Sequence, residues 1–326
     1  MKQEAIAGKK KFTLSVDTKA CIPALISIVA LFVLGQVLAS GFASMRNISS
    51  ILTQSGLLLV ISVGQALVFF AGNGGIDLSV GAFVSMGALI GAEFMNGKNE
   101  LIPLGILMVV LFGGVFGTIN GLGVQLLKIP ALAMTLAMSS VVNGFTMWYT
   151  NGLPQAKVPS LLAGMGRSLV GQLRPLMIIA VVVIVVMELV MRRTRFGRSI
   201  YMVGSSRRAA MLSGINVNLV SILVYTLSGA LSCVGGLLFL GYVGAGQLGM
   251  GDSYTMMTVA AVVIGGVSVN GGRGTFVGVA LGSIVYLLMS SVLVALGLDP
   301  GVRTFFQGLI LAVILIANCR SAKLRK

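Results

Sequence analysis

Long apolar runs, separated by short polar or glycine-rich stretches, dominate this chain from residue 21 to residue 319. A helix needs about 20 predominantly apolar residues to cross the hydrocarbon core of a membrane. Dividing the runs on that basis, with glycine, proline and charge clusters as breaks, predicts about ten spans. They are expected at residues 21–40, 51–71, 79–95, 102–126, 131–150, 175–191, 218–243, 255–270, 275–297 and 303–319. The predicted fold is therefore an all-α, polytopic membrane helix bundle.

The composition agrees with this pattern. The mean hydropathy is +1.02, and only 10% of residues are charged, whereas about a quarter are charged in a typical soluble domain. The net charge of +15 does not indicate a nucleic-acid partner, because the basic residues cluster at the ends of apolar runs. That distribution is the orientation signal of membrane proteins.

The charges predict an orientation in the membrane. An even number of spans puts both basic termini on one side, expected to be the cytoplasm. The chain then divides into an N-terminal tail (1–20), a membrane domain (21–319) and a basic C-terminal tail (320–326). The loop 192–217 holds six arginines and is expected in the cytoplasm, whereas the outer loop 151–174 carries Lys157, Arg167 and Arg174 against the rule. The first run lacks a clear cleavage site and is interpreted as a retained span.

Two glycine-rich stretches predict broken or re-entrant segments. The first runs from Gly72 to Ala82 and contains Asp77 just before a new apolar run. An aspartate there either caps the backbone amides of the following helix or contacts a solute or ion. Non-helical backbone at membrane depth must be covered by protein or line a wet cavity. The second stretch, 265–275, lacks the lysine and Ser/Thr ending of a nucleotide-binding loop, so this chain is not expected to hydrolyse ATP.

Glycine is abundant, with 44 residues, and recurs at close spacing inside the spans, as at Gly113, Gly114, Gly117 and Gly121. Such glycines are expected to let helix backbones approach closely.

The chain has no histidine, and its three cysteines lie far apart. This argues against a metal site, a cofactor site and a Ser-His-Asp or Cys-His catalytic group, so no catalytic residue and no enzyme activity are predicted.

Several blocks of sequence, in order along nearly the whole chain, resemble a known family. They are Gly74-Gly-Ile-Asp-Leu-Ser-Val-Gly81, Leu127-Lys-Ile-Pro-Ala131 followed by Thr135-Leu136, Thr194-Arg-Phe-Gly-Arg-Ser-Ile-Tyr201 running on to 209–216, Val263-Ile-Gly-Gly-Val-Ser268 and Gly271-Gly-Arg-Gly-Thr275. This pattern is similar to the inner-membrane permease subunits of bacterial ABC importers for monosaccharides of the ribose, xylose and arabinose group.

The resemblance implies a set of partners: an ABC ATPase subunit, a periplasmic sugar-binding protein, a second permease copy or paralogue, the sugar itself and the lipid membrane. It also implies a short cytoplasmic helix, near Gly204 to Gly214, that docks into a groove of the ATPase. Relatives usually carry an acidic residue before the Ala-Ala pair, where this chain has Ser206-Arg207-Arg208, so a more acidic groove is expected. The residues expected to couple to the ATPase are Arg195, Phe196, Gly197, Gly204, Arg207, Arg208, Ala209, Ala210, Ser213 and Gly214.

In this family a central cavity translocates the sugar, and the binding protein largely sets specificity. The polar or glycine residues expected near the path are Gln65, Asn73, Gly75, Asp77, Ser79, Thr135 and Asn143. Each polar side chain among them could instead make only interhelical hydrogen bonds.

Two further functions compete with sugar import. A permease of the same family could serve another small hydroxylated solute, such as an autoinducer, a polyol or a nucleoside. An ion-coupled secondary transporter working alone would need intramembrane relay groups, for which the chain offers only Asp77 and Glu93.

Overall fold

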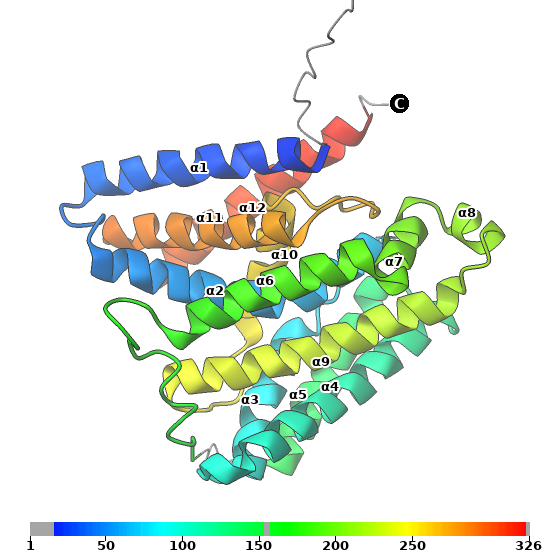
Figure 1. Ribbon diagram of the computed structural model, residues 1–326, viewed down its shortest axis with the longest axis horizontal. Coiled ribbons are helices and arrows are strands. Elements are labelled where there is room, and N and C mark those ends of the chain that lie inside the picture. The colour runs from blue at the N-terminus through cyan, green and yellow to red at the C-terminus, as the bar shows by residue number, and fades with distance from the viewer. Residues whose placement is uncertain (1–15, 73, 153–156, 324–326) are drawn as a thin grey trace, which may run out of the picture.

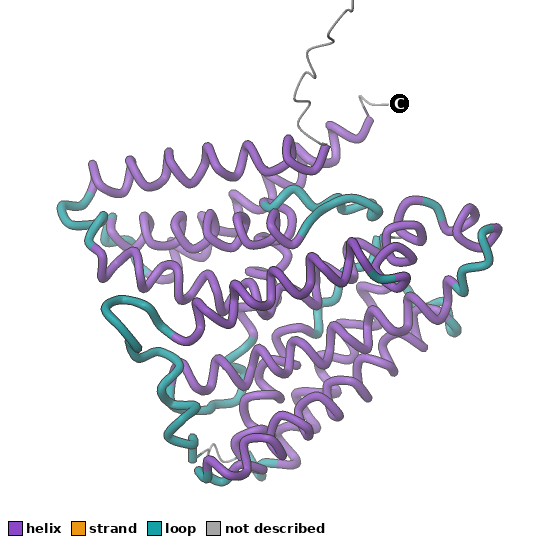
Figure 2. Tube along the Cα trace, viewed as in Figure 1, coloured by secondary structure: helices purple, strands orange, loops and turns teal. Residues whose placement is uncertain are grey.

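The computed structural model describes residues 16–72, 74–152 and 157–323. Over these residues the chain forms helices joined by loops, with no strand (Figure 2), which confirms the all-α prediction. The helices are α1 (Val16–Leu38), α2 (Met45–Ala71), α3 (Val80–Met95), the 3₁₀ turn η1 (Asn99–Leu101), α4 (Ile102–Gln125), α5 (Ala131–Tyr149), α6 (Pro175–Arg193), α7 (Arg195–Ser205), α8 (Arg207–Leu212), α9 (Val217–Val243), α10 (Asp252–Ile264), α11 (Phe276–Ala295) and α12 (Pro300–Lys323).

Each of the ten predicted spans overlaps one of these helices, but their lengths differ. Among the described residues, six helices are long and apolar enough to cross a membrane, namely α2, α4, α5, α6, α9 and α11, the α4 span including η1. The other four, α1, α3, α10 and α12, contribute apolar stretches of only 10 to 17 residues. The sequence therefore predicts the number of apolar helices, whereas the number of crossings is not fixed by length alone.

Helix α10 is the clearest difference from prediction. It has 13 residues and ends at Ile264, not at residue 270. At 1.5 Å per residue it is about 20 Å long, less than the roughly 30 Å of the hydrocarbon core. The pair Gly265-Gly266 stops the helix, because Gly266 adopts a φ of 79°, which a helix cannot continue through.

The short helices α3 and α10 lie inside the bundle, between the longer ones (Figure 1). Helix α3 packs against α4, α5, α9 and α10, and α10 packs against α2, α3 and α11. Helix α2 is almost wholly buried along its membrane stretch, whereas α4, α5 and α6 are mostly exposed on their outer sides. The start of α1 and the end of α12 lie at the same end of the bundle as α7 and α8 (Figure 1).

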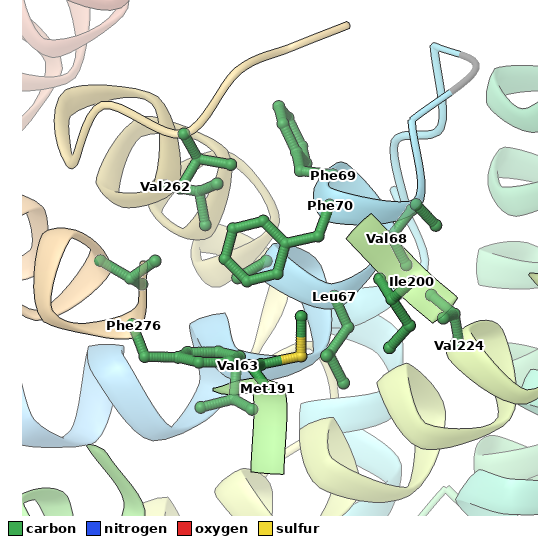
Figure 3. Close-up of a cluster of buried hydrophobic side chains, with 14 of the residues drawn as sticks. Val63, Leu67, Val68, Phe69, Phe70, Met191, Ile200, Val224, Val262 and Phe276 are labelled. Atoms are coloured by element: carbon green, nitrogen blue, oxygen red, sulfur yellow. The ribbon is translucent and has the colours of Figure 1, made fainter. Parts of the chain in front are cut away.

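The largest buried cluster joins seven helices, α2 and α6 to α11 (Figure 3). Phe70 of α2 lies at its centre, with its ring 5.3 Å from the rings of both Tyr201 and Phe276. Met191 of α6 and Ile200 of α7 complete the contact. The cluster therefore packs the loop helix α7 directly against the membrane helices.

Glycines bring helix backbones together, as the spacing predicted. A Cβ atom added at Gly229 of α9 would lie 2.2 Å from the carbonyl oxygen of Gly113 of α4. One at Gly117 would lie 2.4 Å from the carbonyl oxygen of Tyr225. These distances are far below an ordinary contact, so only glycine fits at the crossing of α4 and α9.

Helix α5 has an unusual outer face. Of the six helices long enough to span, it has the lowest mean hydropathy, yet it is no more buried than α4. Small and polar residues lie along its exposed side, including Ala133, Ala137, Ser140 and Gly144, and Asn143 is half-buried beside them. Large apolar residues are exposed on the same helix, namely Leu132, Leu136, Val141, Met147 and Trp148, so this face mixes apolar side chains with small ones that allow a close helix approach.

Candidate functional site

The first break in the bundle lies between α2 and α3. Helix α2 ends at Ala71, and Gly72 follows it with a φ of 71° while donating its N–H to the carbonyl of Phe69. Gly74 also has a positive φ, 66°, which glycine adopts at little cost. Helix α3 begins only at Val80. The described residues between the two helices are thus non-helical, as predicted, while Asn73 lies outside the described residues.

Asp77 is fully buried in this break. Its Oδ1 atom accepts the backbone N–H of Ser79 at 3.0 Å and also the Ser79 hydroxyl. Its Oδ2 atom accepts the hydroxyl of Ser228, on α9, at 2.7 Å. The carboxylate therefore binds the backbone N–H of Ser79, the residue before α3, and ties that point to α9, while no side chain caps the first amides of α3 itself.

Two further helices hold the same segment. The Asn120 side-chain amide, from α4, donates to the Ser79 hydroxyl at 2.9 Å. The backbone N–H of Leu78 donates to the Thr135 hydroxyl, from α5, at 3.1 Å. Helices α4, α5 and α9 thus fix the break, and the structure brings together Asp77, Ser79 and Thr135.

The remaining described path candidates form no hydrogen bond with Asp77, Ser79 or Thr135. Gln65 is fully buried in α2, and neither atom of its amide group has a hydrogen-bond partner among the described residues. Asn143 lies about two turns beyond Thr135 on α5. Gly75 is buried, and a Cβ atom there would lie 3.1 Å from the carbonyl oxygen of Gly72. A side chain at Gly75 would therefore require the neighbouring atoms to shift by a few tenths of an ångström.

The second break, residues 265–275, meets the first one at the end of α7. The backbone N–H of Gly272 donates to the carbonyl of Phe70 at 3.0 Å. A Cβ atom at Gly204 would lie 1.9 Å from that same carbonyl oxygen and 2.5 Å from the Gly272 nitrogen. Tyr201 of α7 donates its hydroxyl to the carbonyl of Gly274 at 2.7 Å. We call this meeting point of residues 72, 204 and 271–272 the glycine junction.

A short helix, α8, lies in the range where the sequence predicts a coupling helix, and a longer helix, α7, precedes it. Thr194 caps α7 by accepting the N–H of Gly197 at 3.0 Å, and Ser206 caps α8 by accepting the N–H of Ala209 at 3.3 Å. Gly197 packs so closely on α6 that a Cβ atom there would lie 2.4 Å from the Cα atom of Met191. The loop is therefore rigidly seated on the bundle.

Helix α8 forms the tip of the molecule (Figure 1). Ala210 is its buried contact, and most of the helix is exposed, with Leu212 84% exposed. The exposed coupling candidates are Arg195, Arg208, Ala209, Ser213 and Gly214, with Phe196 and Gly204 partly exposed. An apolar side chain this exposed at a helix tip is typical of a protein contact.

Arg207 differs from its neighbour Arg208. The sequence led us to expect both arginines to face an acidic partner groove, but Arg207 turns inward. It donates to the side-chain oxygen of Gln125 at 2.5 Å and to the hydroxyl of Ser221 at 3.0 Å. Helical periodicity separates adjacent residues by about 100°, so the two side chains cannot share one face.

Arg207 reaches a cavity of about 490 Å³ between the first break and α8. The cavity is lined by residues of the break, the α4–α5 connection and the start of α9, including Gly75, Lys128, Pro130, Asn218 and Tyr225. Partial burial lowers the pKa of the Arg207 guanidinium from its ordinary value, but an arginine remains charged at neutral pH.

Comparison with known proteins decides the family. Residues 47–317 match the family described as the permease component of the branched-chain amino acid transport system. The chain belongs to this permease family. The ribose import permease of Escherichia coli K12 is 31% identical over 97% of both chains. The galactose/methyl galactoside import permease of the same strain is 31% identical over 83% of this chain and 85% of the relative.

A third relative is the autoinducer 2 import system permease of Photorhabdus luminescens, which is 29% identical over 92% of this chain and 89% of its own. No solved structure matches the chain significantly. The resemblance inferred from the ordered motifs is thus confirmed, and the family is one of transport subunits rather than enzymes.

Sequence reasoning missed several residues that the structure brings to the site. Ser228 and Asn120 bind the break, and Gln125, Ser221 and Tyr225 line the cavity beside Arg207. Asn120 could have been noticed as a carboxamide inside an apolar span. The serines gave no such signal, because serine is common at interhelical contacts.

Proposed function

We propose that this chain is the membrane permease through which a binding-protein-dependent ABC importer passes a monosaccharide. The observation that carries the proposal is the similarity to a ribose import permease over 97% of both chains. ATP hydrolysis belongs to a separate ATPase subunit, and a periplasmic binding protein delivers the solute. The sequence supports a separate ATPase subunit, because the chain contains no nucleotide-binding loop.

Reconstitution in liposomes tests the function directly. Permease, ATPase and binding protein together should accumulate a labelled sugar with ATP, and omission of any one component should abolish accumulation. The permease alone should accumulate no solute with or without an ion gradient. Accumulation by the permease alone along an ion gradient would show a secondary transporter instead.

A second candidate solute is an autoinducer or another small hydroxylated molecule, such as a polyol or a nucleoside. The similarity to the autoinducer 2 permease over 92% of this chain favours it. Competition in the same liposomes separates the two. Ribose, galactose and autoinducer 2 are each added unlabelled against the labelled solute, and the true solute is the one that competes at the lowest concentration.

The coupling of ATP hydrolysis is proposed to run through α8. The helix is exposed at the tip of the molecule, and Arg208 and Leu212 offer a charge and an apolar side chain on its outer side. The α7–α8 loop also contacts both breaks through the glycine junction, at the end of α7. Movement of α7 and α8 would therefore be transmitted to the backbone near Asp77 through direct backbone contacts and not through side chains.

The translocation path is proposed to follow the first break. Gly75, Asp77, Ser79 and Thr135 lie on one continuous segment or contact it, and Gln65 supplies a buried amide whose hydrogen-bonding groups are unpaired among the described residues. Hydroxyl and amide groups that can exchange partners suit a neutral, hydroxylated solute. Asn143, half-exposed on α5, is proposed to face the path from the outer side of that helix.

The outer face of α5 is proposed to meet a second permease copy or a paralogue. Helix α5 is the least apolar of the long helices and yet is largely exposed. Its small residues, Ala133, Ala137, Ser140 and Gly144, permit the close helix approach that drives association in lipid. A cysteine introduced at Ala137 should form a disulfide between copies in membranes, whereas one at Val185 on the exposed side of α6 should not.

All ten apolar helices are proposed to cross the membrane or to enter it, with both termini, Ser206 and Arg273 in the cytoplasm. The clustering of arginines on the α7–α8 loop supports this orientation. The short helices α3 and α10 would cross only part of the hydrocarbon core, and the two breaks would cover the remaining depth. The test is the cysteine labelling described in the Discussion.

A further inference from the structure

The cavity beside Arg207 has a chemistry that sugar import does not require. Arg207 and Lys128 both line it, and none of its described lining residues is acidic. Within the described part of the chain the one ion pair is between Arg192 and Glu188, so neither cation of the cavity has a carboxylate partner. A neutral sugar has no charge to balance two cations, whereas an anion does.

The polar groups around the two cations are also incompletely bonded. The Nε atom of Arg207 is buried and has no hydrogen-bond partner among the described residues. A buried donor without a partner is unfavourable by about 1–3 kcal/mol. Tyr225 is only 4% exposed and also lines the cavity. An oxyanion in the cavity would meet the Arg207 guanidinium and the Tyr225 hydroxyl as donors.

The backbone at the start of helix α5 also favours an anion in the cavity. Helix α5 starts at Ala131, and its first residues line the cavity. Pro130 precedes them and offers no side-chain cap, so the first amides of this 19-residue helix have no side-chain partner at the cap. The positive end of a helix favours an anion. Here it acts together with two cations and the Tyr225 hydroxyl.

We propose that this cavity binds a small anionic solute through a phosphate-type oxyanion group held between Arg207, Lys128 and Tyr225. A volume of about 490 Å³ lies within the range of small-molecule sites and accommodates a phosphate monoester of a sugar. The bound group would link α8, through Arg207, to the α4–α5 connection, through Lys128. The same phosphate chemistry could come from a soluble ester or from the headgroup of an anionic phospholipid.

Binding is tested on the full-length permease, purified in a neutral, phosphate-free detergent, by equilibrium dialysis with labelled inorganic phosphate and with a hexose monophosphate. Arg207→Gln and Lys128→Asn each remove one charge. Asparagine suits position 128 because Lys128 has a φ of 57°, which asparagine tolerates better than most residues. Tyr225→Phe removes only the hydroxyl. Arg208→Gln is the matched control, since it removes the same charge from the exposed side of the same helix.

The wild type and Arg208→Gln are expected to bind with affinities within about twofold of each other. Loss of a charge-assisted hydrogen bond is expected to weaken binding by Arg207→Gln and Lys128→Asn about tenfold or more. Size-exclusion profiles identify any variant that fails to fold, in which case the other charge variant and Tyr225→Phe decide. Binding of the hexose monophosphate but not of the neutral hexose identifies the phosphate group as the recognised part.

The lipid source is separated by a second measurement. Thermal unfolding is compared in nanodiscs that contain or lack phosphatidylglycerol. If inorganic phosphate does not bind but phosphatidylglycerol stabilises the wild type and Arg208→Gln and not the two cavity variants, the proposal stands with a lipid headgroup as the ligand. The proposal is overturned if neither phosphate binding nor stabilisation by phosphatidylglycerol is observed. It is also overturned if Arg208→Gln loses the effect as much as the cavity variants do. Because these assays measure binding and not transport, a negative result leaves the importer function untouched.

Discussion

Gly204 offers the sharpest test of how the α7–α8 loop is joined to the breaks. Replacing it with alanine adds one methyl group, which would lie 1.9 Å from the carbonyl oxygen of Phe70 and 2.5 Å from the nitrogen of Gly272. An ordinary contact begins at 3.4 Å. Both neighbours are backbone atoms, so the substitution can be accommodated only if α7 moves away from the two breaks.

The magnitude follows from this geometry. Adding a methyl group to a packed interior typically destabilises by about 1–3 kcal/mol. The shift would also break the hydrogen bond from the Gly272 N–H to the Phe70 carbonyl, which contributes about 1 kcal/mol more. A local destabilisation of roughly 2–4 kcal/mol lowers the population of the closed junction about 30-fold or more relative to its open form.

The assay is ATP hydrolysis by the reconstituted importer, with and without the loaded binding protein, together with sugar uptake. Gly204→Ala should insert at normal levels but lose most of the stimulation and uptake. Gly308→Ala is the control, because no atom lies within 4 Å of a Cβ atom at that position of α12. If Gly204→Ala retains full stimulation and uptake, the junction does not transmit motion and the coupling route proposed through it is refuted.

Three further predictions follow from the site and the orientation. Asp77→Asn keeps a side chain that can bond Ser79 and Ser228 and should retain far more uptake than Gly75→Leu, whose side chain would crowd the carbonyl of Gly72 and the side chain of Val68. Equal and complete loss at normal expression would favour direct solute contact by Asp77. Arg208→Glu, on the exposed side of α8, should weaken co-purification of the ATPase, and unchanged retention would mean that this charge makes no contact. In a cysteine-free background, Ser206→Cys should react with an impermeant reagent only in inverted vesicles, and Gly249→Cys should react only in intact cells. The reverse pattern would show that the protein has the opposite orientation.

Much of the helix arrangement can be predicted from the sequence because its signals are local. Apolar runs, glycine pairs and capping residues mark where helices begin and end, and Ser206 marks the start of α8 in this way. Helix α7 was not separated from α8 beforehand, because both lie in one arginine-rich loop without an apolar run. The early end of α10 was visible at Gly265-Gly266, but the apolar residues after it suggested a longer span.

The site could be predicted only in part, because its contacts join distant residues. Asp77 was identified from its place before an apolar run, but its partner Ser228 lies 151 positions away. Helical spacing does not say which of two adjacent arginines faces inward, since that depends on where α4 and α9 lie. The bonds from Arg207 to Gln125 and Ser221 therefore required the structure.

The exposed face of α5, if it is the proposed contact with a second permease, would make the stability of this subunit depend on its concentration. If a second permease covers that face, association and folding are linked, and the free energy of assembly adds to the stability of each copy. The unfolding temperature should then rise with permease concentration in the membrane. If the subunits are made in unequal amounts, the surplus permease copies remain unassembled. In that form they are least stable and are open to proteolysis before they transport a solute.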